Sequence, residues 1–298
     1  MIATEIDINI VQQVINNYFR SNVELEQMKS GVSTYVYRVW HDNQLYYLRV
    51  LPEDASFAAE AKAHEIMLEC GINVPKPIYF EHKNILLEKS LMLTSEIPGQ
   101  CIEINGTNNT DLLLNAGKQL ALINSIKVDG FGFINRNNFH DLTGEKHTFK
   151  EYYYDKLYAY IDSLYSYGFD TDNIKKIMDK AYLMLETKDA FLVHGDFDST
   201  HIFQNDGLYS GIIDFGEIRG SNYLYDLGHF KLHEDFDSFK YLAKGYNDVR
   251  KLAAEDYRKI DYLALFVGLG RSKYEHYRNL VKKQLEVLSQ SNMACIMC

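Results

Sequence analysis

Two aspartates in the middle of the chain, each at the end of a short apolar run, constrain the fold more than any other feature. Residues 191–193 lead into Asp196, and residues 208–213 lead into Asp214. Between the two runs, residues 205–207 read Asn-Asp-Gly, which predicts a tight turn because Asn or Asp before Gly tolerates a positive φ. Short strands around this turn place Asp196 and Asp214, 18 positions apart, at the same end of one small ribbon.

This pair of carboxylates favours a cation-binding site. Two carboxylates held side by side repel each other unless a cation lies between them, and divalent metals with phosphate ligands suit such a pair. The alternative is two solvated aspartates in ordinary turns. Because apolar strands position both residues, the sequence favours the paired site.

The residues around the pair carry a family resemblance. His194-Gly195-Asp196, followed by Ile213-Asp214-Phe215-Gly216, resembles the catalytic core of protein kinases and, more closely, of the aminoglycoside phosphotransferase and choline kinase group. The resemblance implies that Asp196 accepts the proton of the attacking hydroxyl, and that Asp214 and the residue five positions after Asp196 hold Mg²⁺ against the phosphates. That residue is His201, where the protein-kinase pattern has Asn. Asp226 matches a structural Asp of the family that fixes the catalytic loop by hydrogen bonds.

The first hundred residues predict a small sheet lobe. Apolar spacing predicts helices at 8–20 and 57–71, the second of which ends at a glycine. Alternation with period two between 23 and 51 predicts three antiparallel strands. Two further strands, at 77–80 and 86–96, complete a five-stranded antiparallel sheet.

The same lobe carries the predicted nucleotide site. Arg49 lies in an apolar strand, where a buried charge needs a partner, and we expect that partner to be Glu60 on the next helix. The resemblance implies that Arg49 binds the phosphates, at a position where the family usually has Lys, and that Glu60 pairs with it. It further implies that a loop covers the nucleotide and that the backbone after the last strand binds the nucleobase of ATP or GTP. The residues concerned are Ser30, Gly31, Ser33, Thr34, Thr94, Ser95, Glu96 and Ile97.

Beyond residue 100 the sequence predicts helices, with no strands apart from the ribbon that carries the aspartates. Together with the resemblance, this pattern predicts an α+β, two-lobed protein-kinase-like fold. Residues 1–97 form an N-terminal nucleotide-binding lobe, and residues 98–298 form a larger, mostly helical catalytic and substrate-binding lobe. The predicted helices of the second lobe are 111–126, 149–167, 172–185, 237–248, 253–269 and 271–289.

Composition narrows the range of partners. A net charge of −10 without a Lys/Arg-rich segment argues against nucleic acid, whose binding is largely electrostatic. The sequence has no run of 18 or more apolar residues, so it predicts no membrane span. The N-terminal residues lack the pattern of a signal peptide. We therefore expect a soluble, cytoplasmic protein, and its acidic balance is compatible with a cationic substrate.

The sequence as a whole predicts a small-molecule kinase that uses Mg²⁺ to transfer the γ-phosphoryl group of ATP or GTP to a hydroxyl. The resemblance implies an aminoglycoside acceptor, and hence antibiotic resistance. Macrolides, choline and homoserine are alternative acceptors, and the departures at Arg49 and His201 leave open a nucleotide-binding protein without catalysis. The acidic residues predicted to meet a cationic acceptor are Asp198, Glu217, Glu234, Asp235 and Asp237.

Overall fold

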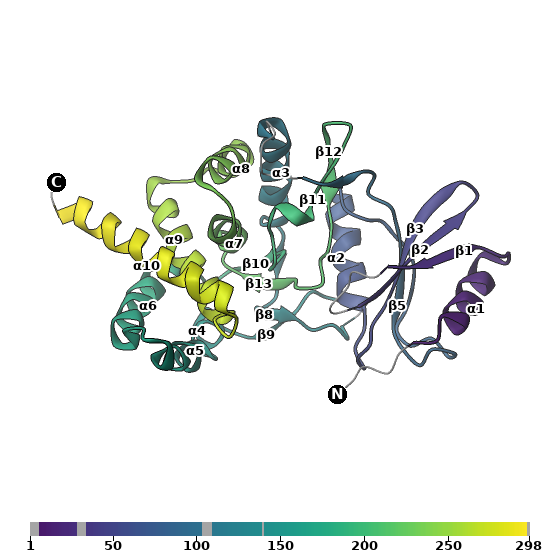
Figure 1. Cartoon of the computed structure of the whole chain (residues 1–298), viewed down its shortest axis with the longest axis horizontal. Helices are drawn as coiled ribbons and strands as arrows, with labels where there is room; N and C mark the ends of the chain where they lie inside the picture. The colour runs from purple at the N-terminus through teal and green to yellow at the C-terminus, as the bar shows by residue number, and fades with distance from the viewer. Residues whose placement is uncertain (1–5, 29–33, 103–108, 139, 297–298) are drawn as a thin grey trace. The chain divides into compact units, whose positions relative to one another are not determined.

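The computed structural model describes residues 6–28, 34–102, 109–138 and 140–296, with side chains up to residue 290. The chain forms two compact units, each of which includes segments distant in sequence (Figure 1). The first unit comprises Met1–Pro98, Asn135–Leu142 and Gly211–Ile213, and the second comprises Gly99–Ile134, Thr143–Ser210 and Asp214–Cys298. In the described part of the chain, no helix is both long and apolar enough to cross a bilayer.

The first unit is built on the predicted five-stranded antiparallel sheet (Figure 1). Its strands lie in the order β1-β2-β3-β5-β4. Alternate residues of β2 and β3, such as Tyr37 and Leu48, are buried with the apolar face of helix α1, as the period-two pattern requires. The bounds are α1 Ile8–Phe19, β1 Glu24–Gln27, β2 Tyr35–His41, β3 Gln44–Val50, α2 Ala58–Glu69, β4 Pro77–Glu81 and β5 Leu91–Ser95.

The boundaries of this unit follow local signals, with one difference. Helix α2 ends just before Gly71, whose φ of +74° an L side chain rarely adopts. The last strand was expected to start at Leu86 but starts at Leu91. Asn84 accounts for the difference, because its side chain accepts hydrogen bonds from the N–H groups of Leu86 and Leu87 and so stabilises a turn there.

The second unit is mostly helical, as predicted. The prediction of a single helix at 149–167 is wrong. The segment forms two helices, interrupted between Tyr154 and Leu157, and a short 3-10 turn follows the second helix. Helix α7, which follows the Asp214 loop, was not predicted. The helices are α3 Thr110–Ile123, α4 Phe149–Tyr154, α5 Leu157–Ser163, α6 Thr171–Leu185, α7 Tyr225–His233, α8 Phe236–Val249, α9 Ala254–Gly270 and α10 Glu275–Ile296.

The second unit also contains a five-stranded sheet, so the expectation that only the ribbon carries strands after residue 100 is wrong. Its order is β7-β10-β13-β8-β9. These strands are only two to four residues long, too short to show an alternating pattern in the sequence. They are β7 Lys127–Val128, β8 Phe131–Ile134, β9 Gly144–Lys146, β10 Ala190–Val193 and β13 Arg219–Ser221.

The predicted ribbon forms from β11 (Ile202–Asn205) and β12 (Leu208–Ile212), joined by a turn with positive φ at Asp206 and Gly207. A third strand, β6 (Gln100–Cys101), pairs with β11. The strand before Asp196 is not part of this ribbon, since β10 pairs with β7 and β13. The expectation that one ribbon carries both aspartates is therefore wrong, and the loop after β10 positions Asp196.

Candidate active site

Asp196 lies in the loop that follows the buried strand β10. The side chain of Asp226, on helix α7, holds this loop in place. The carboxylate of Asp226 accepts hydrogen bonds from the backbone N–H groups of His194, at 2.8 Å, and Gly195, at 2.9 Å, and from Asn124 Nδ2, at 2.8 Å. Gly195 has a φ of +86°, and a Cβ there would lie 2.1 Å from the carbonyl oxygen of Glu217. The predicted structural role of Asp226 is thus confirmed by its contacts.

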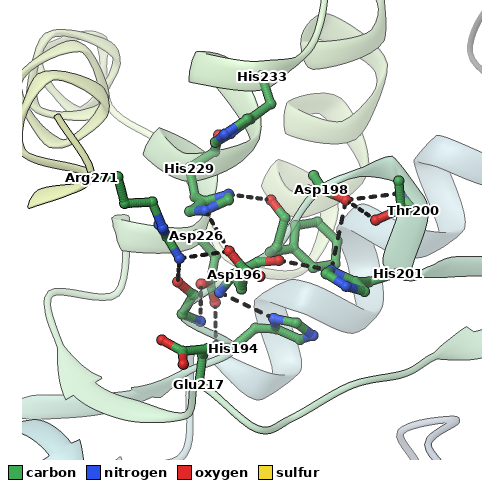
Figure 2. A network of polar contacts seen from close by, with 12 residues as sticks. His194, Asp196, Asp198, Thr200, His201, Glu217, Asp226, His229, His233 and Arg271 are labelled. Carbon is green, nitrogen blue, oxygen red and sulfur yellow. Dashed lines mark hydrogen bonds and ion pairs between the residues drawn. The ribbon is translucent and has the colours of Figure 1, made fainter. Parts of the chain in front are cut away.

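The carboxylate of Asp196 has two cationic or polar neighbours (Figure 2). Arg271 Nη2 donates to Oδ1 at 2.6 Å, and His229 Nε2 lies 3.1 Å from the same oxygen. Burial alone raises the pKa of Asp196, but its contact with His229 and the charge of Arg271 outweigh it and hold that pKa well below its usual range. Asp196 is therefore ionised at neutral pH.

His201 connects Asp196 to Asp214. It ends a 3-10 turn, Ser199–His201, that Asp198 caps by accepting from the N–H of Thr200 at 2.9 Å. His201 Nδ1 lies 2.8 Å from the carbonyl oxygen of Asp196, and because a carbonyl can only accept, this nitrogen carries the proton. Nε2 of the neutral ring then has a lone pair, and it lies 3.8 Å from Asp214 Oδ2.

Asp214 has the backbone geometry of a functional position. Its φ is +65°, a region that costs a residue other than glycine about 1 kcal/mol or more and that persists where surrounding structure enforces it. Its side chain is 55% exposed, whereas that of His201 is 14% exposed. The loop therefore presents the Asp214 carboxylate outward beside a partly buried imidazole.

These two side chains fit one divalent metal that keeps other ligands. Among the described residues, no group of three His, Cys, Asp or Glu side chains gathers to hold a metal. Mg²⁺ is usually bound by one or two protein ligands together with water and phosphate oxygens, so His201 and Asp214 provide a matching partial set. The hydrogen bond at Nδ1 orients the ring as it would for a metal ligand. The metal role of both residues stays a prediction.

In the first unit, Arg49 and Glu60 form the predicted ion pair. Glu60 is buried, and the Arg49 guanidinium lies 5.1 Å from the ring centroid of Phe57. Thr94 and Ser95 end β5, Glu96 and Ile97 follow it, and Thr34 precedes β2. Their role in nucleotide binding stays a prediction, and the predicted loop residues Ser30, Gly31 and Ser33 lie outside the described residues.

The structure brings together some of the acids predicted to bind an acceptor. Glu234 accepts from the backbone N–H of Ser199 at 3.0 Å, which places it beside Asp198. Asp235 caps α8 by accepting from the N–H of Asp237 at 2.9 Å. Glu217 is engaged elsewhere, with Arg219 at 3.0 Å. Contact with an acceptor stays a prediction for all five.

Sequence reasoning missed Arg271 and His229. A signal existed for His229, because it follows Asp226 by three positions and so lies on the same face of α7. Arg271 gave none, since it contacts Asp196 across 75 positions of sequence. Only the folded chain identifies it.

Ligation by His201 predicts a measurable change in metal use. An imidazole nitrogen is a poorer ligand than oxygen for Mg²⁺ and a better one for Mn²⁺. We expect His201→Asn to use Mg²⁺ at least as well as the parent and His201→Ala to need more of either metal, in titrations of activity with each metal. His147→Asn, at an exposed position, is the control. Identical titrations for the parent and both His201 variants would leave His201 with a structural role only.

Comparison with known proteins places the chain in a family. Residues 24–261 match the model of a phosphotransferase enzyme family, abbreviated APH. A search of curated proteins found no match.

Solved structures share the fold at low sequence identity. A thermostable mutant of aminoglycoside phosphotransferase APH(4)-Ia, in ternary complex with AMP-PNP and hygromycin B, has a TM-score of 0.66 and 16% identity, with 96% of this chain and 97% of that chain covered. A protein assigned as a fructosamine-3-kinase from Thermobifida fusca has a TM-score of 0.69 and 18% identity, with 94% and 98% covered. Macrolide 2′-phosphotransferase MphH from Brachybacterium faecium has a TM-score of 0.63 and 11% identity, with 93% and 98% covered. Because the family model spans residues 24–261, the chain belongs to the phosphotransferase enzyme family.

Proposed function

We propose that this protein is a small-molecule kinase that transfers the γ-phosphoryl group of ATP or GTP to a hydroxyl. The observation that carries the proposal is the connected set of Asp196, His201 and Asp214, in which one imidazole contacts both aspartates. In the reaction, a bond forms between the acceptor oxygen and the γ-phosphorus while the bond to the β,γ-bridging oxygen breaks. The hydroxyl proton passes to Asp196, and the nucleoside diphosphate leaves.

Each unit has side chains that suit one part of this chemistry. Arg49, held by Glu60, offers a fixed positive charge to the phosphates. His201 and Asp214 would hold Mg²⁺, which neutralises phosphate charge when bound. Phosphoryl transfer needs positioning and charge neutralisation more than covalent chemistry, and these residues supply both. A nucleoside triphosphate donor is consistent with a cytoplasmic location.

For the acceptor we propose an aminoglycoside, which would make the protein an antibiotic-resistance enzyme. The family resemblance supports this choice, as does the fold shared with a phosphotransferase in complex with hygromycin B. Glu234 accepts from the N–H of Ser199, the residue after Asp198, and the exposed acids Asp235 and Asp237 come just after Glu234 in the chain. Carboxylates are therefore available to ammonium groups. Such contacts are screened by salt, so we expect the acceptor KM to rise with ionic strength.

A second candidate is an acceptor with a carboxylate or phosphate close to its hydroxyl, such as homoserine. The observation that favours it is Arg271, whose guanidinium lies beside Asp196, where the hydroxyl must arrive. The guanidinium would repel a positive charge on the acceptor and attract an anionic group.

A panel of acceptors separates these candidates. Aminoglycosides, a macrolide, choline and homoserine are tested with ATP and with GTP in one coupled assay that detects nucleoside diphosphate. We expect turnover with an aminoglycoside, with an acceptor KM that rises in Glu234→Gln but not in the control Glu255→Gln, an exposed residue of α9. Turnover confined to neutral or zwitterionic acceptors contradicts the aminoglycoside proposal. Nucleotide binding without transfer to any acceptor points to a binding protein that lacks catalysis.

A further inference from the structure

The two oxygens of the Asp196 carboxylate have different surroundings. Oδ1 contacts both Arg271 Nη2, at 2.6 Å, and His229 Nε2, at 3.1 Å. Within the described part of the chain, Oδ2 receives no hydrogen bond or ion pair. Figure 2 shows Arg271 and His229 both directed at Asp196. One oxygen is therefore held while the other is left for a ligand.

The side chains around Oδ1 are fixed by their own contacts. His229 is fully buried in α7, and its Nδ1 lies 2.9 Å from the carbonyl oxygen of Phe197, so Nδ1 carries the proton and the ring packs against Oδ1 without donating to it. The ring of His233 stacks on that of His229 at 4.4 Å between centroids, and its Nε2 lies 3.0 Å from the Tyr277 hydroxyl. The guanidinium of Arg271 lies 5.7 Å from the Tyr277 ring centroid. Residues from α7, the end of α9 and α10 thus form one packed support.

We propose that Arg271 is a positioning residue, which fixes Oδ1 of Asp196 so that Oδ2 accepts the hydrogen bond of the acceptor hydroxyl. This inference rests on the proposed function, in which Asp196 receives the hydroxyl proton. It assigns a role to the C-terminal helices, because Arg271 lies beyond residues 24–261, which match the family model.

Fixing one oxygen matters because a carboxylate rotates easily. The terminal torsion of Asp is broad and roughly two-fold, so an unheld carboxylate samples many orientations of its two oxygens. A reacting group misplaced by about 1 Å can cost about a hundredfold in rate. The charged hydrogen bond from Arg271 to Oδ1 restricts this rotation and keeps Oδ2 in one place.

The first test is kinetic. We expect Arg271→Ala to lower kcat about tenfold to a hundredfold with little change in the KM for nucleotide, because only the orientation of Asp196 changes. Arg271→Lys should retain more activity than Arg271→Ala, and added guanidinium ion should partly restore Arg271→Ala. Lys273→Gln, an exposed charge two positions away, is the control for loss of positive charge. Parental kcat in Arg271→Ala, or a loss that neither Lys nor guanidinium relieves, overturns the inference.

The second test does not depend on turnover. Crystal structures of the parent and of Arg271→Ala are compared at Asp196, and we expect the carboxylate to rotate or become disordered in the variant. A second variant, Arg271→Lys, keeps a charged donor near Oδ1 and should preserve the orientation. An unchanged Asp196 carboxylate in Arg271→Ala overturns the inference even if the enzyme is inactive. A parent that transfers phosphate to no acceptor overturns the proposed function alone, since the crystal structures still decide the orientation.

Discussion

Asp196→Ala is expected to lower turnover by about 10² to 10⁴, the usual contribution of a general base, while nucleotide binding persists. The loop of Asp196 brings its carboxylate next to Arg271 and His229, and its carbonyl next to His201. The residues predicted to bind nucleotide, Arg49 and Glu60, belong to the other unit. Turnover by coupled assay and nucleotide affinity by calorimetry, both with Mg²⁺, separate these two effects.

Two further variants make this result specific. Asp196→Asn keeps the size of the side chain and an oxygen for Arg271, but it cannot take the hydroxyl proton, so it should lose nearly as much turnover as Asp196→Ala. Asp189→Asn removes an exposed carboxylate just before β10 and should behave as the parent. Turnover within about threefold of the parent in Asp196→Ala would remove Asp196 from the mechanism.

The sequence predicted the parts of the fold that have strong local signals. The sheet of the first unit alternates over strands of up to seven residues, and tight turns such as the one at Asp206 and Gly207 have a specific composition. A partner for Arg49 could be predicted because a charge inside an apolar strand needs one, and the family resemblance indicated Glu60. In each case the physical requirement is visible within a few dozen residues of sequence.

What the sequence did not predict depends on contacts between distant segments. Strand β10 is as apolar as the ribbon strands, and only its pairing with β7 and β13 shows that it belongs to another sheet. Arg271 directly follows α9, and no local feature of the sequence identifies its partner. In the folded chain its guanidinium donates to Asp196. The surroundings of the predicted base, which determine its charge and orientation, were therefore the least predictable part of the site.

Asp226→Ala is expected to destabilise the second unit by about 3 kcal/mol or more. Its carboxylate is fully buried and accepts from three donors, the N–H groups of His194 and Gly195 and the side chain of Asn124. Each buried donor left without a partner costs about 1 to 3 kcal/mol. Urea unfolding followed by far-UV circular dichroism reports mainly on the helices of this unit, whereas fluorescence of Trp40, the single tryptophan, reports on β2 in the first unit.

The matched control is Asp235→Ala, which removes another carboxylate with three donors, the backbone N–H groups of Asp237 and Ser238 and the Ser238 hydroxyl. Because Asp235 is exposed, water can replace it, and the loss of this helix cap should cost only about 0.5 to 2 kcal/mol. The difference between the two variants therefore measures burial of the donors instead of their number. Equal losses in Asp226→Ala and Asp235→Ala would mean that the Asp196 loop does not depend on Asp226, and the loop would then have to be held by the close packing of Gly195 against Glu217.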